Sequence, residues 1–312
     1  MTAEASTEQV AYLRGEMMPA SRAHIAIFDL SVVLGATVTD MTRTMGHKPF
    51  RLDDHIDRFY RSAKYARITP PVSPEETKAR TLELIAHNAG LLRPEQDIGI
   101  VFFMSPGEAA VYAGRSADSA SGPTFCIHSF PIQFQLFRKY YEEGAHVVVP
   151  SVRHIPPQCV DQKIKNRSRL HWWIADQETK LVDPAAITLL LDLDGNVTEC
   201  SGSNFFIIHD GTIIMPSPRN VLRGISFVTV TELAKELGIP VEERDFQLYD
   251  VISADEAVLS STPYCLAPAT KINGLNIGDG RPGPIFRRLM EAWSERVGMD
   301  LVKQVMTAEY TG

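Results

Sequence analysis

The stretch Val160-Asp-Gln-Lys-Ile-Lys-Asn-Arg-Ser-Arg-Leu170 carries two lysines, Lys163 and Lys165, that are separated by one residue. It follows a proline break at Pro156-Pro157 and leads into an apolar, helix-like run. Both lysines could be ordinary surface charges, because lysines are seldom buried. A lysine inside the protein is instead retained for a salt bridge or for covalent chemistry such as a Schiff base. The rest of the chain decides between these interpretations.

The composition is that of an ordinary globular protein of one large or two medium domains. Of the 312 residues, 22% are charged and 44% are hydrophobic. A net charge of -7 gives no indication of a surface for nucleic acid. No apolar run approaches the roughly 20 residues that a membrane span needs, and the N-terminus lacks the pattern of a signal peptide. We therefore expect a cytoplasmic protein that binds neither nucleic acid nor membrane.

The cysteines give no sign of a metal site or of a disulfide framework. Cys126, Cys159, Cys200 and Cys265 lie far apart, with no CxxC pair and no histidines at ligand spacing. Reduced thiols and no bound metal are the expectation.

The periodicity of apolar residues divides the chain into two domains. Residues 1–10 are small and polar and predict a mobile tail. Residues 11–150 predict a small α+β domain, 151–159 a connector, and 160–312 a larger β-rich domain with helices.

Within the first domain, alternating and β-branched runs predict strands, and acidic first turns predict helices that open at Leu52 and behind Ser73. The strands are expected at 11–14, 24–28, 35–43, 98–104 and 123–131. In the second domain Asp-Gly turns predict two hairpins, and apolar spacing predicts three helices. The hairpins are expected at 187–200 and 204–215, the helices at 166–179, 224–237 and 284–297, and further strands at 257–259 and 269–272.

Leu222-Arg-Gly-Ile-Ser226 is suited to a phosphate, although many such helix starts are only caps. Its glycine precedes Ile-Ser at the start of an amphipathic helix, where free backbone N–H groups meet the positive end of the helix dipole. Ser260-Ser-Thr262 offers more hydroxyls, and Arg58 offers a cation. By contrast, Gly278-Asp-Gly-Arg-Pro-Gly283 fits GxGxxG only by its letters, because no clear strand leads into it.

Glu199 is a lone carboxylate at the end of a hairpin strand, and taken alone it is an ordinary strand-end acid. A lysine, a distant carboxylate and a phosphate cradle together match one cofactor, pyridoxal 5′-phosphate. Its aldehyde needs a lysine to hold it as an imine, its pyridine nitrogen needs a carboxylate, and its phosphate needs donors.

The order of these motifs resembles the signature series of the class IV (branched-chain-type) aminotransferases. That family includes branched-chain and D-amino-acid aminotransferases, (R)-selective amine transaminases and aminodeoxychorismate lyase. The resemblance runs from about Ala11 to Val302. It implies a two-domain α+β structure of PLP fold type IV, similar to D-amino-acid aminotransferase, and a homodimer. The motifs that carry it are Phe50-Arg-Leu-Asp-Asp-His-Ile-Asp-Arg58, Ile164-Lys165-Asn166, Val197-Thr-Glu199, Ser203-Asn204-Phe205, Leu222-Arg-Gly-Ile-Ser226, Ser260-Ser-Thr262 and Gly278-Asp-Gly-Arg-Pro-Gly-Pro284.

By this resemblance Lys165 is the catalytic lysine, which binds the cofactor aldehyde and shuttles protons. Lys163 would share its face if the segment were extended, so it is the rival. Glu199 would pair with the pyridine nitrogen. The groups expected to hold the phosphate are Arg58, Ile225, Ser226 and Thr262.

The substrate is less defined, because the tyrosine usual after the lysine and an arginine usual in the strand at 98–104 are both missing. Arg43, Arg153 and Arg169, together with Arg167, are candidates to bind a substrate carboxylate. The resemblance implies ping-pong transfer of an amino group from an amino acid or amine to a 2-oxo acid. An aminodeoxychorismate-type lyase is the alternative within the family. A non-catalytic binding protein on the same scaffold is the alternative of another class.

Overall fold

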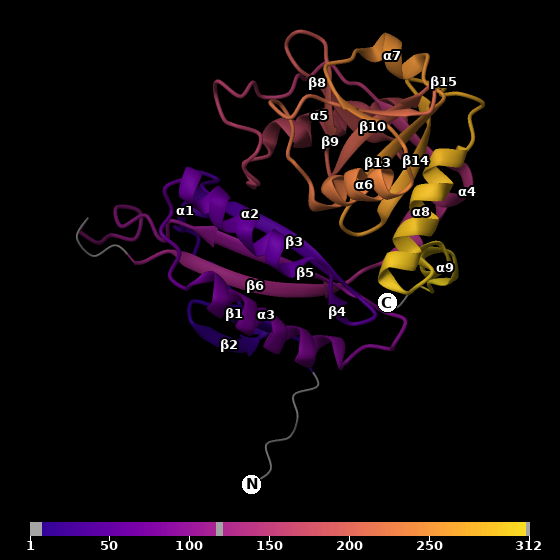
Figure 1. The fold of residues 1–312 in the computed structure, drawn as a ribbon. Coiled ribbons are helices and arrows are strands. Elements are labelled where there is room, and N and C mark those ends of the chain that lie inside the picture. The colour runs from indigo at the N-terminus through magenta and orange to yellow at the C-terminus, as the bar shows by residue number, and fades with distance from the viewer. Residues whose placement is uncertain (1–7, 117–120, 310–312) are drawn as a thin grey trace. The chain divides into compact units, whose positions relative to one another are not determined.

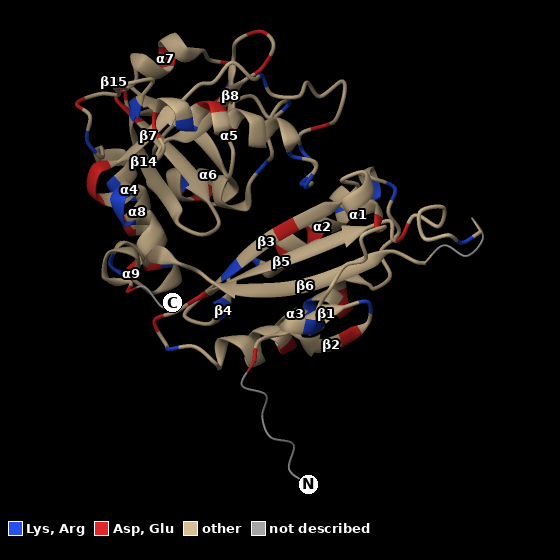
Figure 2. Cartoon of the chain, turned by 180° about the vertical axis from the view of Figure 1, so that it is seen from behind, with Lys and Arg blue, Asp and Glu red and all other residues tan. Residues whose placement is uncertain are grey.

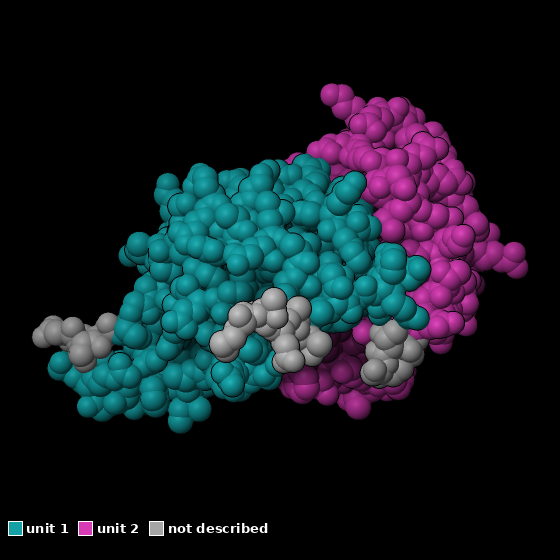
Figure 3. Space-filling view, turned by 90° about the horizontal axis from the view of Figure 1, so that it is seen from below, with its two compact units in different colours: residues 1–132, 164–168 teal, residues 133–163, 169–312 magenta. Residues whose placement is uncertain are grey.

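The computed structural model describes residues 8–116 and 121–309 (Figure 1). Figure 2 shows basic and acidic residues interspersed along the chain, as the mixed composition leads one to expect. The chain divides into two compact units, which Figure 3 colours separately. Unit 1 contains residues 1–132 and 164–168, and unit 2 contains residues 133–163 and 169–312.

These boundaries differ from the predicted ones at two places. Residues 133–150, expected in the first domain, belong to unit 2, because the strand at 145–148 pairs with two strands of that unit. Residues 164–168, expected in the second domain, belong to unit 1. Most of the predicted mobile tail, residues 1–7, lies outside the described residues, and the first strand starts at Val10.

Unit 1 is an antiparallel sheet with strand order β2-β1-β6-β5-β3-β4, and its helices α2 and α3 contact strands of this sheet. Every residue of the central strand β5 is buried, and Phe59 of α2 packs on Phe102 and Phe125 with ring centroids 5.8 and 6.0 Å apart. The elements are β1 (Val10–Leu13), β2 (Glu16–Pro19), η1 (Ala20–Arg22), α1 (Leu30–Val33), β3 (Val38–Met45), β4 (Lys48–Pro49), α2 (Leu52–Tyr65), α3 (Pro74–Ala89), β5 (Ile98–Ser105) and β6 (Thr124–Pro131).

The helix signals in unit 1 are confirmed, and one strand prediction is wrong. Asp53 and Asp54 lie in the first turn of α2, and the Ser73 hydroxyl accepts the Glu76 N–H at 3.2 Å to cap α3. Residues 24–28 form no strand, because their alternating apolar side chains find no core to pack against: Ile27 is 80% exposed.

Unit 2 is built on a closed ring of strands. The strand order is β12-β11-β10-β13-β14-β7-β8-β9, and pairing of β9 with β10 closes the ring. Apolar residues of these strands form one core cluster. The elements are η3 (Phe134–Phe137), α4 (Arg138–Glu143), β7 (Ala145–Val148), α5 (Leu170–Val182), β8 (Ile187–Leu191), β9 (Val197–Cys200), β10 (Ser203–His209), β11 (Thr212–Met215), α6 (Ile225–Glu236), β12 (Val241–Glu243), α7 (Leu248–Ile252), β13 (Glu256–Ser261), β14 (Cys265–Ile272), β15 (Leu275–Asn276), α8 (Pro284–Val297) and α9 (Leu301–Thr307).

Both predicted hairpins are present, and the backbone angles of the second explain why its turn could be predicted from the sequence. Asp210 and Gly211 have φ values of 48° and 73°, the left-handed geometry that a tight two-residue hairpin turn requires. The helix expected at 166–179 is displaced and begins only at Leu170. Within the described residues no helix has the length and apolar character to cross a membrane.

Candidate active site

Lys165 lies on a segment that is fixed to β3 and α2 through its backbone. Its carbonyl accepts the N–H of Thr39 at 2.9 Å, and its own N–H donates to the Ser62 hydroxyl at 3.2 Å. Because the backbone of residues 164–168 forms hydrogen bonds with β3 and α2, these residues cannot begin the helix predicted from Asn166. The half-buried Lys165 is therefore held on a rigid support, as a covalent site requires.

Lys163 has a different environment from Lys165. A turn at 162–163 replaces the extended segment that would have put both lysines on one face. The Lys163 side chain is exposed, and its Nζ lies 3.4 Å from Oδ2 of Asp161. These are the features of a surface charge, and they favour Lys165 as the reactive lysine.

Arg58 is buried in unit 1, where a buried carboxylate orients it. Its Nε and Nη2 donate to Oδ2 and Oδ1 of Asp40, both at 2.8 Å. Oδ1 also accepts the Nδ1–H of His55 at 2.7 Å. Such a bidentate pair fixes the plane of the guanidinium, so that Arg58 is preorganised for its predicted contact with a phosphate.

The charges in this cluster are set by burial and by neighbours. Burial alone would raise the pKa of Asp40, but the Arg58 guanidinium and the His55 hydrogen bond outweigh it and hold this pKa well below 3.8. Burial lowers the pKa of His55 below 6.5, although Asp40 opposes this shift. At neutral pH the cluster therefore consists of a carboxylate, a guanidinium and a neutral imidazole.

We expect Asp40→Asn to destabilise the fold by about 3–5 kcal/mol at pH 7, since it leaves the buried Arg58 charge without its partner. The folded-state pKa of Asp40 is depressed, so its contribution is complete above its ordinary pKa of 3.8 and is lost as the pH falls through the folded value. Urea unfolding between pH 3 and 8 measures this, and the gap between wild type and variant should narrow toward acid pH.

The matched control is Asp57→Asn, which removes the partner of Arg61 in an exposed pair on the same helix. Exposed pairs contribute about 0–1 kcal/mol, so this change should be nearly silent. Equal losses in the two variants would show that Asp40 has no special role.

Glu199, on β9 of unit 2, is surrounded by N–H groups. Its Oε2 accepts the Asn204 side-chain amide at 3.2 Å and the Leu222 backbone N–H at 3.1 Å. Its Oε1 lies 3.4 Å from Nε2 of His154. A carboxylate held by such donors presents a fixed negative charge, which suits a protonated pyridine nitrogen.

Asn204 connects Glu199 to the loop that leads to α6. On β10 it lies opposite Glu199 on one neighbouring strand and opposite Ser260 on the other. Its amide also donates to the Leu222 carbonyl at 2.7 Å, which fixes the loop that leads to α6. Gly224 in this loop approaches so closely that a Cβ there would lie 2.2 Å from Oδ1 of Asn204.

Ile225 and Ser226 form the first turn of α6, as the sequence predicts. No side chain caps this helix at Gly224, so its first N–H groups are available to an anion. Thr262 lies in the turn between β13 and β14, and the hydroxyl of the neighbouring Ser260 is buried without a hydrogen-bond partner among the described residues. Unit 2 thus contains Glu199, Ile225, Ser226 and Thr262, whereas Arg58 and Lys165 belong to unit 1.

The candidate arginines have different surroundings. Arg43 is buried and pairs with Asp97 at 3.2 Å, so its contacts give it a structural role, and we leave it out of the substrate site. Arg153 is exposed and donates to the Pro150 carbonyl at 3.2 Å. Arg169 lies over the Trp172 ring with its Cζ 5.3 Å from the centroid, and Arg167 lies over Phe103 at 5.8 Å.

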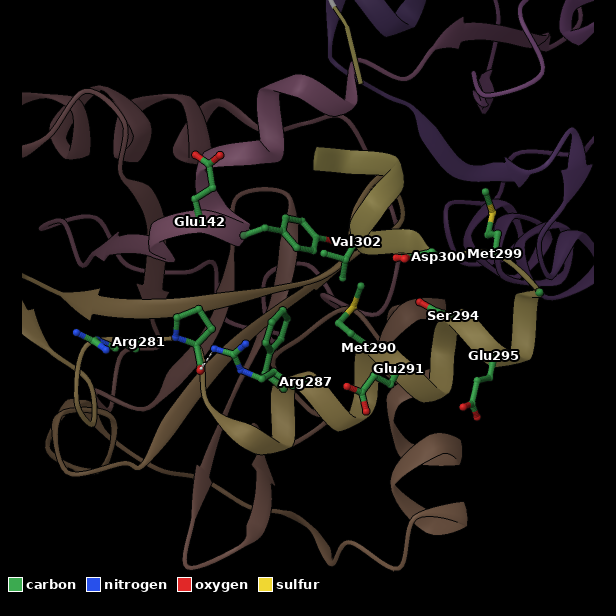
Figure 4. Close-up of a pocket in the computed structure, with 14 residues that line it drawn as sticks. Glu142, Arg281, Arg287, Met290, Glu291, Ser294, Glu295, Met299, Asp300 and Val302 are labelled. Atoms are coloured by element: carbon green, nitrogen blue, oxygen red, sulfur yellow. Dashed lines mark hydrogen bonds between the residues drawn. The ribbon is translucent and has the colours of Figure 1, made fainter. Parts of the chain in front are cut away.

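The groove drawn in Figure 4 lies elsewhere in unit 2 and contains none of the predicted site residues. Its volume is about 1020 Å³, and charged side chains such as Arg287, Glu291 and Glu295 line it together with Met290. Residues of α8 and α9 supply half of this lining. The groove therefore does not argue for a different candidate active site.

The comparisons with known proteins agree with the geometry. Residues 37–272 match the family described as amino-transferase class IV, and the chain belongs to this family. A putative branched-chain-amino-acid aminotransferase of Methanocaldococcus jannaschii is 31% identical, over 91% of this chain and 95% of that protein. A D-alanine aminotransferase of Listeria monocytogenes is 29% identical, over 88% and 91%. The chain spans only 50% of the branched-chain-amino-acid aminotransferase-like protein 1 of Arabidopsis thaliana, with 28% identity.

Among solved structures, a T.th. branched-chain amino acid aminotransferase, crystallised with pyridoxamine 5′-phosphate, superposes with a TM-score of 0.81. It is 25% identical and is covered to 94%, against 93% of this chain. The predicted α+β architecture of fold type IV is confirmed. The chain is an aminotransferase, and the cofactor of its family is pyridoxal 5′-phosphate.

The residues present fit this cofactor. The lysine is half-buried on a fixed backbone, the carboxylate is surrounded by donors, and an uncapped helix start lies in the same unit as that carboxylate. Sequence reasoning missed the supporting residues Asp40, His55, Asn204 and His154. The quoted motifs contain His55 and Asn204 without assigning them a role. No sequence signal marks the other two, because their partners are distant in the chain.

Proposed function

We propose that this protein moves an amino group between an amino acid or amine donor and a 2-oxo acid by a ping-pong mechanism. The observation that carries the proposal is the environment of the Glu199 carboxylate. The N–H groups of Asn204 and Leu222 donate to it, and Nε2 of His154 lies 3.4 Å away. In this proposal Lys165 binds the cofactor covalently and Glu199 pairs with its pyridine nitrogen. The phosphate is held by Arg58, Ile225, Ser226 and Thr262.

When bound, pyridoxal phosphate supplies an aldehyde for the amine and a ring that accepts electrons. The chain supplies the groups that handle protons. Nζ of Lys165, when not bound to the cofactor, would carry a proton between the α-carbon of the substrate and the aldehyde carbon of the cofactor. Glu199 keeps a proton on the pyridine nitrogen by its negative charge, and Arg153 or Arg169 is our candidate for a substrate carboxylate.

We further propose that the protein is a cytoplasmic homodimer. Support for the dimer comes from exposed apolar side chains of unit 1 on two segments that are joined by a hydrogen bond from the Leu30 N–H to the Gly107 carbonyl. These side chains are Ile27, Val32, Leu34, Val111 and Tyr112. Light scattering tests the dimer, and a monomeric mass would contradict it.

Support for a cytoplasmic location comes from the four cysteines, which are all free thiols.

The proposed activity predicts a visible absorption band for the protein loaded with pyridoxal phosphate. One of D-alanine, L-leucine and (R)-1-phenylethylamine, each added singly, should convert this band to one of shorter wavelength, and a 2-oxo acid should restore it. The amine that converts the band identifies the donor class. Absence of any visible band after incubation with the cofactor would contradict the proposal. Release of pyruvate from a single substrate, without conversion of the band, would indicate a lyase instead.

A further inference from the structure

His154 is a buried histidine to which the proposed function assigns no role. It lies within the proline-flanked segment 151–159 of unit 2 and is 2% exposed. Its backbone N–H donates to the Leu191 carbonyl at 2.9 Å, which ties it to the end of β8. Its Nε2 is 3.4 Å from Oε1 of Glu199 but has no hydrogen-bond partner among the described residues. A buried polar atom without a partner is costly, so this one requires an explanation.

The other ring nitrogen fixes the tautomer. Nδ1 of His154 accepts the backbone N–H of Ile155 at 3.1 Å, so it carries no proton. A neutral imidazole with an acceptor at Nδ1 carries its proton at Nε2. His154 therefore directs an N–H donor at Oε1 of Glu199, at a distance that shortens by a few tenths of an ångström when a hydrogen bond forms.

The surroundings of His154 keep the ring in this orientation. It stacks on His171 at a centroid distance of 5.8 Å and meets the edge of Trp172 at 5.2 Å. Burial, followed by the neighbouring His154 ring and the Arg169 guanidinium, lowers the pKa of His171 to about 4, so His171 is neutral at pH 7. Aromatic packing on two sides leaves the ring of His154 little freedom to turn away.

We propose that His154 is a positioning residue that acts through Glu199. Its Nε2–H completes the set of donors around the carboxylate by binding Oε1, while Asn204 and Leu222 bind Oε2. With both oxygens bound, the carboxylate plane is fixed toward the pyridine nitrogen. The long contact in the structure corresponds to a hydrogen bond that tightens when the site is loaded, as catalytic hydrogen bonds do.

The test rests on the proposed function and uses protein loaded with pyridoxal phosphate that is labelled with ¹⁵N at the pyridine nitrogen. Glu199→Gln is the reference, because it removes the charge itself and should move the pyridine resonance toward the unprotonated position. We expect His154→Leu to move the resonance in the same direction and to lower kcat by about tenfold, the effect of one charge-assisted hydrogen bond. His154→Gln, whose amide can replace Nε2–H, should restore much of both.

His171→Leu is the matched control, since it removes the neighbouring stacked imidazole, whose described contacts do not include Glu199. It should leave the pyridine resonance unchanged. An unshifted resonance in His154→Leu, or an equal shift in His171→Leu, would overturn the proposal. If Glu199→Gln also leaves the resonance unshifted, the assigned role of Glu199 fails and the role of His154 falls with it.

Two further measurements keep the proposal testable if His154→Leu folds poorly. In wild-type protein with ¹⁵N-labelled histidine, one buried ring should show the proton at Nε2, and its shift should change when cofactor is added. The resonances of His154 are identified as those that disappear in His154→Gln, and a proton at Nδ1 of this ring would overturn the proposal. In the Glu199→Gln background, His154→Phe, which keeps an aromatic ring but has no N–H, should cost almost nothing further, because coupled residues are not additive. Independent, multiplying losses would show that His154 acts elsewhere.

Discussion

Lys165→Ala is expected to abolish the visible band of lysine-bound pyridoxal phosphate and to lower turnover by about four orders of magnitude or more. The reason is chemical, because alanine has no nitrogen to bind the aldehyde or to carry the proton. The backbone of residue 165 should stay in place, since its N–H and carbonyl bind Ser62 and Thr39 through bonds that an alanine can also make. Absorbance, turnover and cofactor affinity measured on one preparation check this result.

Lys163→Ala is the matched control for this variant. Lys163 is exposed and pairs with Asp161 on the surface, so its loss should leave both the band and turnover nearly unchanged. An added small amine should restore part of the turnover of Lys165→Ala, because it can replace the missing proton carrier. The opposite pattern, with the band lost in Lys163→Ala and kept in Lys165→Ala, would transfer the catalytic role to Lys163.

The sequence was most informative where local rules decide the structure. Ser73 and Pro74 start α3, Pro284 starts α8, and Asp210-Gly211 closes a hairpin, each through backbone geometry that one or two residues impose. Residues 24–28 show the limit of this approach. Their pattern alternates like a strand, but whether such a pattern forms a strand depends on a partner and a core that are set by distant parts of the chain.

The residues of the candidate site likewise fall into those that could be predicted from the sequence and those that could not. Lys165, Glu199 and the start of α6 could be predicted, because each belongs to a short motif. The helix expected from Asn166 could not be corrected from sequence. The residue before it, Lys165, is bound to Thr39 and Ser62, and the Arg167 N–H donates to the Thr37 hydroxyl, all more than 100 residues away. Asp40 and His154 were missed for the same reason, because a buried ion pair or an aligned imidazole is defined only by its partners.

Glu199→Gln is expected to keep the cofactor bound while kcat falls by about 10²–10⁴-fold, the usual size of a lost proton-transfer function. The change keeps the volume of the side chain, and its carbonyl oxygen can still accept the N–H groups of Asn204 and Leu222. What is lost is the negative charge that keeps a proton on the pyridine nitrogen. Steady-state kinetics with a titration of the cofactor separate this loss from weaker binding.

Glu178→Gln is the matched control, since Glu178 also accepts hydrogen bonds in unit 2, from the backbone and hydroxyl of exposed Ser151. It should leave kcat unchanged.

In Glu199→Gln the new amide would place a second donor beside Nε2–H of His154, and the Ile155 N–H prevents that ring from changing tautomer. We therefore expect the amide to twist out of the plane that the carboxylate occupies. Near-normal kcat in Glu199→Gln would remove Glu199 from its proposed role, because neither the charge nor the plane would then matter to turnover.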